Sequence, residues 1–375
     1  MVDFFFYGTL CHRPLLHAVL GRAVHPEPAR LPDHAVHWAS EQGFPLIVAR
    51  TGAVAQGVLL RGLTEAEAAR LDYYEGGFGY HCQDVRVETE GGIVTARVYL
   101  PAPGMWQPGA PWSLPAWVAR WGAMVTEAAT EYMDGFGRVP AEQARAGYRR
   151  VLARAADRLR ARAAPAPTTL RRAQAPGDLD VLSVARPWAG FFAIEEWQFR
   201  HRRFDGAMGP PIRREAFVTP DAVSVLPYDP VRDRVLVVEQ FRAGPAARGD
   251  PQGWQLEAVA GMIDPGETPE QTARRECQEE AGLALGALHR VCGYYPSPGT
   301  HTEFVTSFIG VADLPDGAAG QGGLAQEHED IRSHLLSFDA LMALIETGEA
   351  ATGPLLVSAF WLGRERPGLR AAATR

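Results

Sequence analysis

The stretch GMIDPGETPEQTARRECQEEAGL (residues 261–283) decides the fold of the second half of this chain. It gathers six carboxylates within twenty-three residues. Thr268 is a predicted N-cap, Pro269 follows at the first helical position and Gln271 at the third, a pattern that predicts a capping box and then a helix. Gly282 is placed to end that helix just after its last turn.

The acidic residues of this helix gather along one edge. At about 100° per residue, Glu276, Glu279 and Glu280 fall within an arc of about 100°. An apolar stripe beside them consists of Ala273, Cys277 and Ala281. Two carboxylates about 6 Å apart repel each other by roughly 3 kcal/mol at an effective dielectric near 20. The cluster therefore predicts a divalent cation with oxygen ligands, Mg²⁺ or Mn²⁺, and the alternative is an acidic helix without a ligand.

The spacing of the same residues resembles the Nudix box without a departure. The matching positions are Gly261, Glu267, Arg275, Glu276, Glu279, Glu280 and Gly282. Resemblance to Nudix hydrolases implies an α/β/α sandwich that hydrolyses a nucleoside diphosphate linked to another group. It implies that Glu276, Glu279 and Glu280 bind the metal, with Glu280 also catalytic. The carbonyl of Ala260 would join these ligands. Arg275 would pair with Glu267 to brace the loop, and Gly261 and Gly282 are structural.

Flanking segments extend the resemblance over most of residues 181–365. They are GFFAIEEWQFRHRRFDGAMGPPIRREAF, YDPVRDRVLVVEQFRAG, WQLEAVAGMI, SPGTHTE and LAQEHEDIR, and together they are similar to the bacterial ADP-ribose pyrophosphatases. Pro298, fifteen residues beyond the box, is the downstream signal of that subgroup. The resemblance implies hydrolysis of ADP-ribose to AMP and ribose 5-phosphate. Another ADP-sugar or NADH is the alternative substrate. A non-catalytic nucleotide sensor is the alternative class, although such modules normally lose box carboxylates.

The resemblance also implies where the substrate binds. Phe191 and Arg214 would hold the adenine ring between them; the other interpretation of Phe191 is an ordinary residue of a strand core. Arg242 would reach the diphosphate, a task suited to a guanidinium group. The alternative for Arg242 is a structural ion pair with Glu239 or Glu257.

Downstream residues complete the site implied by the resemblance. Ser297, Pro298 and Glu303 would contact the adenosine or the terminal ribose. The resemblance implies that the loop DGAAGQGGLAQEHEDI supplies the catalytic base, Glu327, with Glu329 as the alternative, and its glycines are interpreted as a hinge. Enzymes of this kind are dimers that exchange N-terminal strands, so the long apolar ribbon GFFAIEEWQFRHRRF predicts a homodimer formed through the Nudix domain.

A second resemblance covers about the first hundred residues. The segments FFFYGTL (4–10), FPLIVA (44–49), ARLDYYEG (69–76) and VTARVYL (94–100) resemble the γ-glutamylcyclotransferase-like fold, a β-barrel-type domain. The resemblance implies that the backbone of Tyr7, Gly8, Thr9 and Leu10 holds a γ-glutamyl group. It implies that Glu75 moves the proton as a γ-glutamyl amine cyclises to 5-oxoproline. The family commonly continues with YxR, whereas this chain has Tyr80-His81-Cys82, so a ligand-sensing module or a structural partner is the alternative.

Length and composition divide the chain into parts. At 375 residues, two or three domains are expected. We expect a two-domain protein of α/β and α+β class. The expected parts are a γ-glutamylcyclotransferase-like domain (1–103), a helical extension (104–163), a linker (164–180) and a Nudix domain (181–375). The helix at 141–162 carries seven arginines, which indicate either a surface for anionic ligands or the solvated face of an amphipathic helix.

Composition also excludes several functions. A net charge of −7 argues against binding to nucleic acid or to an anionic membrane. The chain contains no lysine, which excludes a Walker-type phosphate loop and Schiff-base chemistry. The four cysteines form no CxxC pair, and the start lacks the basic region of a signal peptide, so a cytoplasmic protein is expected. Fusions of this kind resemble proteins grouped with tellurite-resistance ADP-ribose pyrophosphatases.

Overall fold

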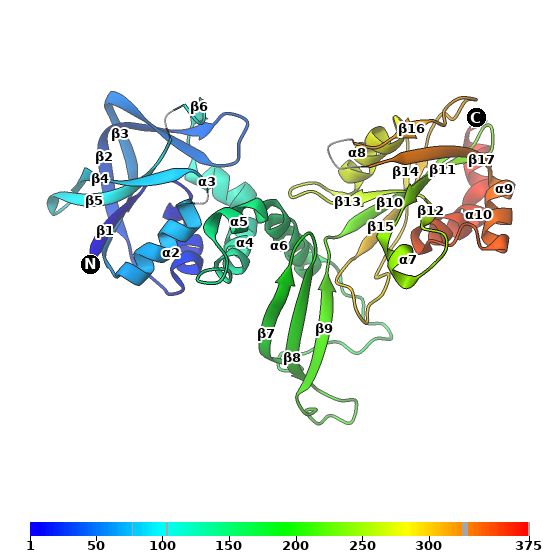
Figure 1. The fold of residues 1–375 in the computed structure, drawn as a ribbon, viewed down its shortest axis with the longest axis horizontal. Coiled ribbons are helices and arrows are strands. Elements are labelled where there is room, and N and C mark those ends of the chain that lie inside the picture. Colours follow the sequence, from blue (N-terminus) through cyan, green and yellow to red (C-terminus); the bar gives the residue numbers. More distant parts are fainter. Residues whose placement is uncertain (77, 103, 325–328, 374–375) are drawn as a thin grey trace. The chain divides into compact units, whose positions relative to one another are not determined.

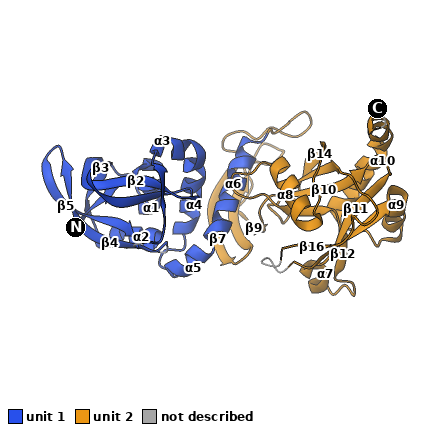
Figure 2. Ribbon diagram, turned by 90° about the horizontal axis from the view of Figure 1, so that it is seen from above, with its two compact units in different colours: residues 1–164 blue, residues 165–375 orange. Residues whose placement is uncertain are grey.

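The computed structural model describes residues 1–76, 78–102, 104–324 and 329–373. The chain divides into two compact units, Met1–Ala164 and Pro165–Arg375, which Figure 2 shows in blue and orange. Each unit has hydrophobic cores of its own, which agrees with the expected two domains. Within the described ranges, no helix is long and apolar enough to cross a membrane.

The first unit is built around a β-sheet that closes on itself (Figure 1). Its strands are β1 (Val2–Phe6), β2 (Glu27–Ala39), β3 (Pro45–Leu63), β4 (Tyr80–Thr89), β5 (Gly92–Pro101) and β6 (Pro108–Pro111). They follow the order β3-β1-β5-β4-β2-β6, and β3 also pairs with β2. The first five strands therefore form a closed barrel, as predicted for this domain, and β6 extends it beside β2. Only the pairing of β1 with β5 is parallel among these barrel strands.

The run Phe4-Phe5-Phe6 explains why β1 is buried on both faces. Successive side chains of a strand point to opposite sides. Phe5 packs into a cluster made of strand residues and Tyr7, which is the interior of the barrel. Phe4 and Phe6 pack into a second cluster, formed between the barrel and the helices of this unit. One strand thus joins two cores, and its last residue leads directly into the Tyr7–Leu10 loop.

Short helices cover the outer face of the barrel. Those near the N-terminus are the 3-10 turn η1 (Thr9–Cys11), α1 (Arg13–Leu20) and α2 (Glu65–Gly76). The helical extension contains α3 (Leu114–Trp117), the π-helical turn η2 (Val118–Gly122), α4 (Ala123–Met133), α5 (Ala141–Ala146) and α6 (Tyr148–Ala163). Helix α4 packs against both α1 and α6, so the extension is part of the first unit's core.

Three arginines of α6 pair with acids of α4. Arg154 donates to Glu131 over 2.6 Å, and both side chains are buried. Arg158 bridges Glu127 and Glu131, and Arg162 also pairs with Glu127. For Arg154, Arg158 and Arg162, neither a surface for anionic ligands nor a simply solvated face applies. They hold α6 against α4, because burial leaves a guanidinium stable only where a carboxylate accompanies it.

The second unit contains a mixed sheet between two layers of helices. Its strands are β10 (Ala222–Asp229), β11 (Arg234–Phe241), β12 (Trp254–Glu257), β13 (Val259–Met262), β14 (Leu288–Tyr294), β15 (Val305–Val311), β16 (Gln321–Gly322) and β17 (Ile331–Ser337). The main path is β14-β15-β10-β11-β17-β16, with β12 beside β11 and β13 beside β10. The pairing of β10 with β15 is parallel and the other pairings are antiparallel.

Alternation along the strands sends side chains into two separate cores. Leu236 and Val238 of β11 pack with α8 (Pro269–Ala281). Val235 and Val237 of the same strand pack with α9 (Phe338–Thr347) and α10 (Gly353–Ala373) on the other face. Figure 1 shows α8 on one side of the sheet and these two helices on the other. The short helix α7 (Ala243–Arg248) follows β11.

A separate antiparallel sheet precedes the mixed sheet. It consists of β7 (Leu179–Ala189), β8 (Ala193–His201) and β9 (Ile212–Val218), in that order. The Phe217 amide donates to the Thr300 carbonyl over 2.7 Å, which links the end of β9 to the loop after β14. The edge strand β7 leaves large apolar side chains exposed, among them Leu179, Val181, Val184 and Trp188.

Candidate functional site

Helix α8 begins and ends where its sequence predicts. The Thr268 hydroxyl accepts from the Gln271 amide, and the Gln271 side chain accepts from the Thr268 amide, so the capping box is confirmed. Gly282 follows the last turn in the left-handed conformation, with φ 64°. Ala273 and Cys277 are fully buried and dock the helix against the sheet. This docking turns the acidic edge of α8 toward β13.

Arg275 ties the acidic helix to the loop before it. Its Nε and Nη2 donate to the two carboxylate oxygens of Glu267, each over 3.0 Å. Its Nη1 donates to Glu276 over 2.6 Å and to Glu279 over 2.9 Å. Burial by itself would raise the pKa of Glu267, but the hydrogen bonds from Arg275 and Thr272 lower it below its ordinary value. The predicted brace between Arg275 and Glu267 is thus present in the structure.

Gly261 leaves room for a metal-site carboxylate. It lies on β13, and a Cβ atom built there would lie only 2.0 Å from Oε1 of Glu276. No side chain fits in this space unless Glu276 moves. The glycine therefore allows the helix and the strand to approach with a carboxylate between them.

Glu280 is the most buried acid of the cluster. Its side chain is 3% exposed, and its Oε2 has no hydrogen-bond partner among the described residues. Burial, together with the charges of Glu276 and Glu329, raises the pKa of Glu280 to about 9, although a hydrogen bond from the Ala260 backbone opposes this shift. Burial likewise raises the pKa of Glu276 to about 7. The surroundings therefore disfavour the negatively charged form of both acids.

These residues fit a divalent cation in their chemistry. Carboxylate oxygens are the ligands that Mg²⁺ and Mn²⁺ prefer. Because Oε2 of Glu280 has no hydrogen-bond partner among the described residues, it is available as a metal ligand. In the part of the chain that is described, however, no three His, Cys, Asp or Glu side chains converge closely enough to hold an ion as they stand. The reason is visible in the contacts of Arg275, which occupies the carboxylates of Glu276 and Glu279.

Comparison with known proteins identifies this arrangement. Residues 218–356 match the model of the NUDIX domain. The ADP-ribose pyrophosphatase of Escherichia coli (strain K12) is 38% identical over 185 residues, which cover 49% of this chain and 88% of that protein. The chain belongs to the Nudix family. Its second unit is accordingly a Nudix hydrolase domain, and α8 with the preceding loop is its Nudix box.

Further relatives share the same half of the chain. The ADP-ribose pyrophosphatase of Haemophilus influenzae is 34% identical over 187 residues, 49% of this chain and 86% of that protein. The GDP-mannose pyrophosphatase of Enterobacter sp. (strain 638) is 32% identical over 145 residues, 39% of this chain and 74% of that protein. A solved structure titled as an ADP compounds hydrolase is similar over 52% of this chain and 98% of its own, at 17% identity and a TM-score of 0.41.

Arg242 lies beside the Nudix box and is held by an acid. It pairs with Glu257 through Nη2 over 2.6 Å, and its Nε also donates to that carboxylate. Burial disfavours the charged form, but the bonds with Glu257 and the nearby charges of Glu280 and Glu329 raise the pKa of Arg242. The structure thus contains the ion pair named as the alternative, and it also brings Arg242 to the acidic cluster.

Of the two candidate bases, Glu327 and Glu329, only Glu329 belongs to the described residues. Glu327 lies outside the described residues. Glu329 is half-buried, and its Oε2 accepts from the Leu324 amide over 3.0 Å. Gly322 packs against the end of α8, where a Cβ atom would lie 1.9 Å from the Glu280 carbonyl oxygen. This close approach keeps the glycine-rich loop beside the Nudix box.

Phe191 and Arg214 are not brought together within one chain. Phe191 is exposed in the turn between β7 and β8, with its ring edge-to-face against Phe192 at 4.8 Å. Arg214 pairs in register with Trp197, while Ala193 marks the turn end of the ribbon. Four residues of strand therefore separate Arg214 from that end, roughly 13 Å.

The remaining predicted contacts lie in the loop after β14. The hydroxyls of Ser297 and Thr300 share a hydrogen bond of 2.9 Å, and Pro298 lies exposed in the same turn. Glu303 is half-buried further along the loop, where burial and the charge of Asp221 raise its pKa. This loop holds β9 through Thr300, so it connects the mixed sheet to the three-stranded sheet.

The predicted site of the first unit lies at the end of β1. The Tyr7 hydroxyl donates to the Tyr99 carbonyl over 3.0 Å. At Gly8 a Cβ atom would lie 2.5 Å from the ring of Pro45, so the loop passes close to β3. Thr9 and Leu10 form the turn η1, and Leu10 is buried.

Glu75 is an acid that forms no salt bridge with a cation among the described residues. It lies near the end of α2, and burial raises its pKa to about 7. Its charge acts on Tyr7 and on Tyr80, whose pKa values burial raises first and Glu75 raises further. The structure thus brings Glu75 to the Tyr7 end of the barrel. Residues 4–117 match the model of the family described as gamma-glutamyl cyclotransferase, AIG2-like.

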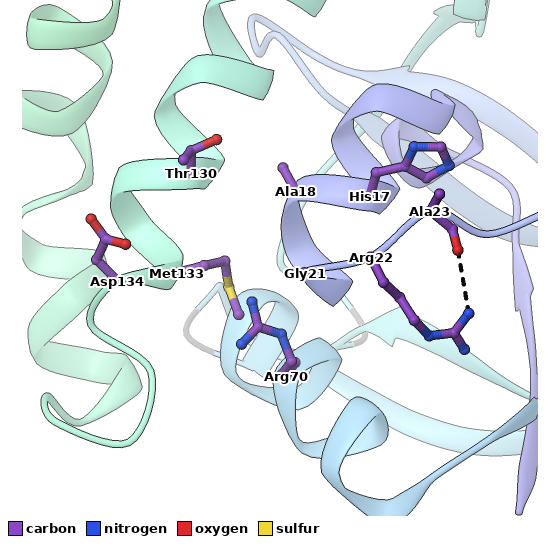
Figure 3. Close-up of a pocket in the computed structure, with 9 residues that line it drawn as sticks. All are labelled: His17, Ala18, Gly21, Arg22, Ala23, Arg70, Thr130, Met133 and Asp134. Atoms are coloured by element: carbon purple, nitrogen blue, oxygen red, sulfur yellow. Dashed lines mark hydrogen bonds between the residues drawn. The ribbon is translucent and has the colours of Figure 1, made fainter. Parts of the chain in front are cut away.

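A surface cavity of about 590 Å³ in the first unit contains none of the predicted site residues (Figure 3). It is lined by His17, Ala18, Gly21, Arg22, Ala23, Arg70, Thr130, Met133 and Asp134. Its two arginines already have structural partners. Arg70 donates to the Val19 carbonyl at the end of α1 over 2.8 Å, and Arg22 pairs with Glu67 of α2. The acid clusters therefore mark the functional sites better than this cavity does.

Sequence reasoning missed the residues that surround these acids from distant parts of the chain. Thr272 helps to hold Glu267, with its hydroxyl 2.7 Å from Oε2. Tyr132 and Tyr148 of the helical extension lie within electrostatic reach of Glu75. Thr272 stands one turn beyond the helix start and was identifiable from spacing. The tyrosines gave no local signal, because only the packing of α4 and α6 brings them to α2.

Proposed function

We propose that the Nudix unit hydrolyses ADP-ribose to AMP and ribose 5-phosphate with the help of a divalent cation. The observation that carries the proposal is the buried, unpartnered carboxylate of Glu280 beside Glu276, on a helix braced by Arg275. The ADP-ribose pyrophosphatases among the relatives support the substrate.

The metal ligands in this proposal are Glu276, Glu279, Glu280 and the Ala260 carbonyl, and the ion is Mg²⁺, with Mn²⁺ as a substitute. When bound, such an ion screens the diphosphate charge and polarises the attacked phosphorus. Arg275 fixes the positions of the Glu276 and Glu279 carboxylates. Gly261 keeps the strand close to the helix.

The other residues of the proposal orient the substrate and move a proton. Arg242 binds the diphosphate, with Glu257 holding its guanidinium in place. Glu327 accepts the proton of the attacking water, and Glu329 is the alternative base. Ser297, Pro298 and Glu303 contact the adenosine or the terminal ribose.

We propose that the adenine site forms between two subunits. A homodimer that covers the exposed apolar face of β7 would bring Phe191 of one copy toward Arg214 of the other, which one chain does not do. Sedimentation equilibrium tests this part: a monomer at micromolar concentration would contradict it.

Product analysis by liquid chromatography tests the substrate. With Mg²⁺ present, we expect ADP-ribose to have a higher kcat/KM than ADP-glucose, NADH or GDP-mannose. Another ADP-sugar or NADH is the alternative substrate, and its ranking first would overturn the specific proposal. GDP-mannose belongs in the assay because one relative is named for it.

A second function is supported by Glu75 in the first unit. We propose that it transfers the proton during cyclisation of a γ-glutamyl amine to 5-oxoproline, with the loop Tyr7–Leu10 holding the glutamyl group. A carboxyl with a pKa near 7 is suited to both accepting and donating a proton at neutral pH. Release of 5-oxoproline that disappears in Glu75→Gln supports this function. No release from any γ-glutamyl amine would favour a ligand-sensing or structural domain.

A further inference from the structure

Tyrosines from two parts of the first unit lie within electrostatic reach of Glu75. The barrel contributes Tyr7, Tyr80 and Tyr99, at the ends of β1 and β4 and on β5. The helical extension contributes Tyr132 from α4 and Tyr148 from the first residue of α6. Glu75 therefore has tyrosine neighbours from the barrel and an aromatic wall, Phe78, Tyr132 and Tyr148, to which the extension contributes both tyrosines.

The wall built by the extension is a continuous set of aromatic rings. The ring of Tyr148 lies edge-to-face against Phe78 at 5.0 Å and against Tyr132 at 5.5 Å. Tyr132 in turn meets Tyr74, the neighbour of Glu75, at 5.9 Å. Each ring fixes the next one, so the surface presented near Glu75 is rigid as well as apolar.

The hydroxyls of this wall differ in their partners. Tyr74 and Tyr148 share a hydrogen bond. The Tyr132 hydroxyl is buried, in a residue only 3% exposed, and has no hydrogen-bond partner among the described residues. A buried hydroxyl without a partner is costly, so a polar group of a ligand or a water is expected to bind there.

The wall is an addition to the matched domain. The family match ends at residue 117, whereas Tyr132 and Tyr148 lie beyond it. The buried pair of Arg154 and Glu131 holds α6 to α4 and so holds both tyrosines in position. Residues outside the matched domain thus form part of the surroundings of its predicted acid.

We propose that Tyr132 and Tyr148 form the binding surface for the amine-derived group of a γ-glutamyl amide, and that they select amines with an aromatic carbon skeleton. This inference rests on the proposed role of Glu75. The backbone amides of the Tyr7–Leu10 loop suit the polar glutamyl end of such a molecule. Aromatic ring faces suit a flat apolar group, which gains both buried area and ring contacts.

The reaction at this site needs no co-reactant. The α-nitrogen of the glutamyl group attacks its own γ-carbonyl carbon and forms the lactam bond. The bond from that carbon to the amine nitrogen breaks. Glu75 takes the proton that the attacking nitrogen loses and delivers it to the departing amine, which leaves the aromatic wall as a free amine.

The test compares two substrates in the full chain. γ-Glutamyl benzylamide and γ-glutamyl methylamide are assayed for 5-oxoproline release, with Tyr148→Ala and Tyr132→Phe as variants. We expect Tyr148→Ala to raise KM for the benzylamide at least tenfold, while KM for the methylamide and both kcat values stay within about threefold. Tyr148→Phe keeps the ring and is expected to keep the preference. Tyr132→Phe is also expected to keep it.

A matched control comes from the same extension. Phe136→Leu removes an aromatic ring that contacts Arg70 and Tyr73. It is expected to change neither KM. Circular dichroism confirms folding, and Tyr148→Leu replaces Tyr148→Ala should the latter not fold. If Tyr148→Ala changed KM equally for the two amides, or changed neither KM, the inference would be overturned while the cyclotransferase function stayed in place.

A third outcome separates the inference from the function on which it rests. If wild-type protein releases no 5-oxoproline from either amide, the catalytic role of Glu75 fails. Isothermal titration calorimetry with the same two amides then tests whether the aromatic wall binds the amine-derived group, independently of catalysis. Tighter binding of the benzylamide that Tyr148→Ala abolishes would support the wall, and absence of binding by both amides would overturn it.

Discussion

The carboxyls of buried Glu280 and half-buried Glu75 both have raised pKa values, yet their surroundings are opposite. Glu280 lies in a cluster of acids, with Arg275 and Arg242 nearby. Glu75 lies among tyrosines, and burial is the cause of its shift. Burial and neighbouring charges together raise the pKa of Glu280 in one unit, whereas burial alone raises the pKa of Glu75 in the other.

This difference separates two kinds of chemistry. Several oxygens that repel one another gain most from a bound cation, which neutralises them together. A single carboxyl in an apolar place gains nothing from a cation held by it alone, but it can exchange a proton near neutral pH. The first arrangement suits phosphoryl chemistry, and the second suits proton transfer during cyclisation.

Glu280→Gln gives the largest expected effect, because it removes one member of the cluster. We expect kcat for ADP-ribose to fall by at least about 10³-fold, since the bound cation is asked to supply several kcal/mol. The measurement is steady-state hydrolysis with Mg²⁺. Glu270→Gln, an exposed acid on the same helix, is the control and should leave kcat unchanged. Turnover of Glu280→Gln near the wild-type rate would contradict the metal assignment.

Glu131→Gln tests a third buried carboxyl, one that is paired with an arginine. Removing the charge leaves Arg154 buried without its partner, so we expect the first unit to lose about 3 kcal/mol of stability. Scanning calorimetry of the full chain measures the shift in Tm. The exposed Glu142 of the same extension supplies the control, Glu142→Gln, with an expected change below about 0.5 kcal/mol. An equal shift for the two variants would contradict the buried pair.

Gly261→Ala tests whether the acidic cluster depends on close approach of the strand. The added Cβ atom would overlap the Glu276 carboxylate and displace it, so we expect kcat to fall about tenfold, equivalent to about 1.4 kcal/mol. Gly244→Ala is the control, because nothing lies within 4 Å of the added atom. Unchanged hydrolysis by Gly261→Ala would show that Glu276 has room to move without loss.

Glu75→Gln gives the smallest expected effect, a shift of Tm that depends on pH. Because burial raises the pKa of Glu75 from 4.5 to about 7, its contribution to stability is full below pH 4.5 and is lost as pH rises through about 7. The variant does not titrate there, so its Tm relative to wild type should rise by a few degrees between pH 5 and pH 8. Glu65→Gln, exposed on the same helix, should show no such trend. A parallel pH dependence of the two variants would place Glu75 in solvent.

The local spacing of residues was sufficient to predict the helix of the Nudix box and its caps. The cap at Thr268, the stop at Gly282 and the buried stripe of Ala273 and Cys277 all follow from helical periodicity, and the structure agrees with them. The pairing of Arg275 with Glu267 also agrees with the resemblance. These features depend on residues close together in the chain, which is why a sequence pattern contains them.

Distant contacts were beyond the reach of the pattern. Arg154, Arg158 and Arg162 of α6 pair with acids of α4 some twenty to thirty-five residues earlier, and the number of arginines alone did not predict these pairs. Arg242 was assigned to substrate with an ion pair as the alternative, and its bond to Glu257 depends on the register of β11 with β12. Phe191, in the turn between β7 and β8, and Arg214, on β9, belong to the same three-stranded sheet, but they lie at different positions along the direction of its strands.

By itself, the sequence determined two domains, an acidic helix with its caps, and the positions of the candidate acids. Only the tertiary structure decided what each acid experiences, because a pKa depends on burial and on neighbours that the chain brings from far away. Glu280 acquires its unpartnered oxygen when α8 docks on β13, and Glu75 acquires its tyrosines when α4 and α6 pack beside α2.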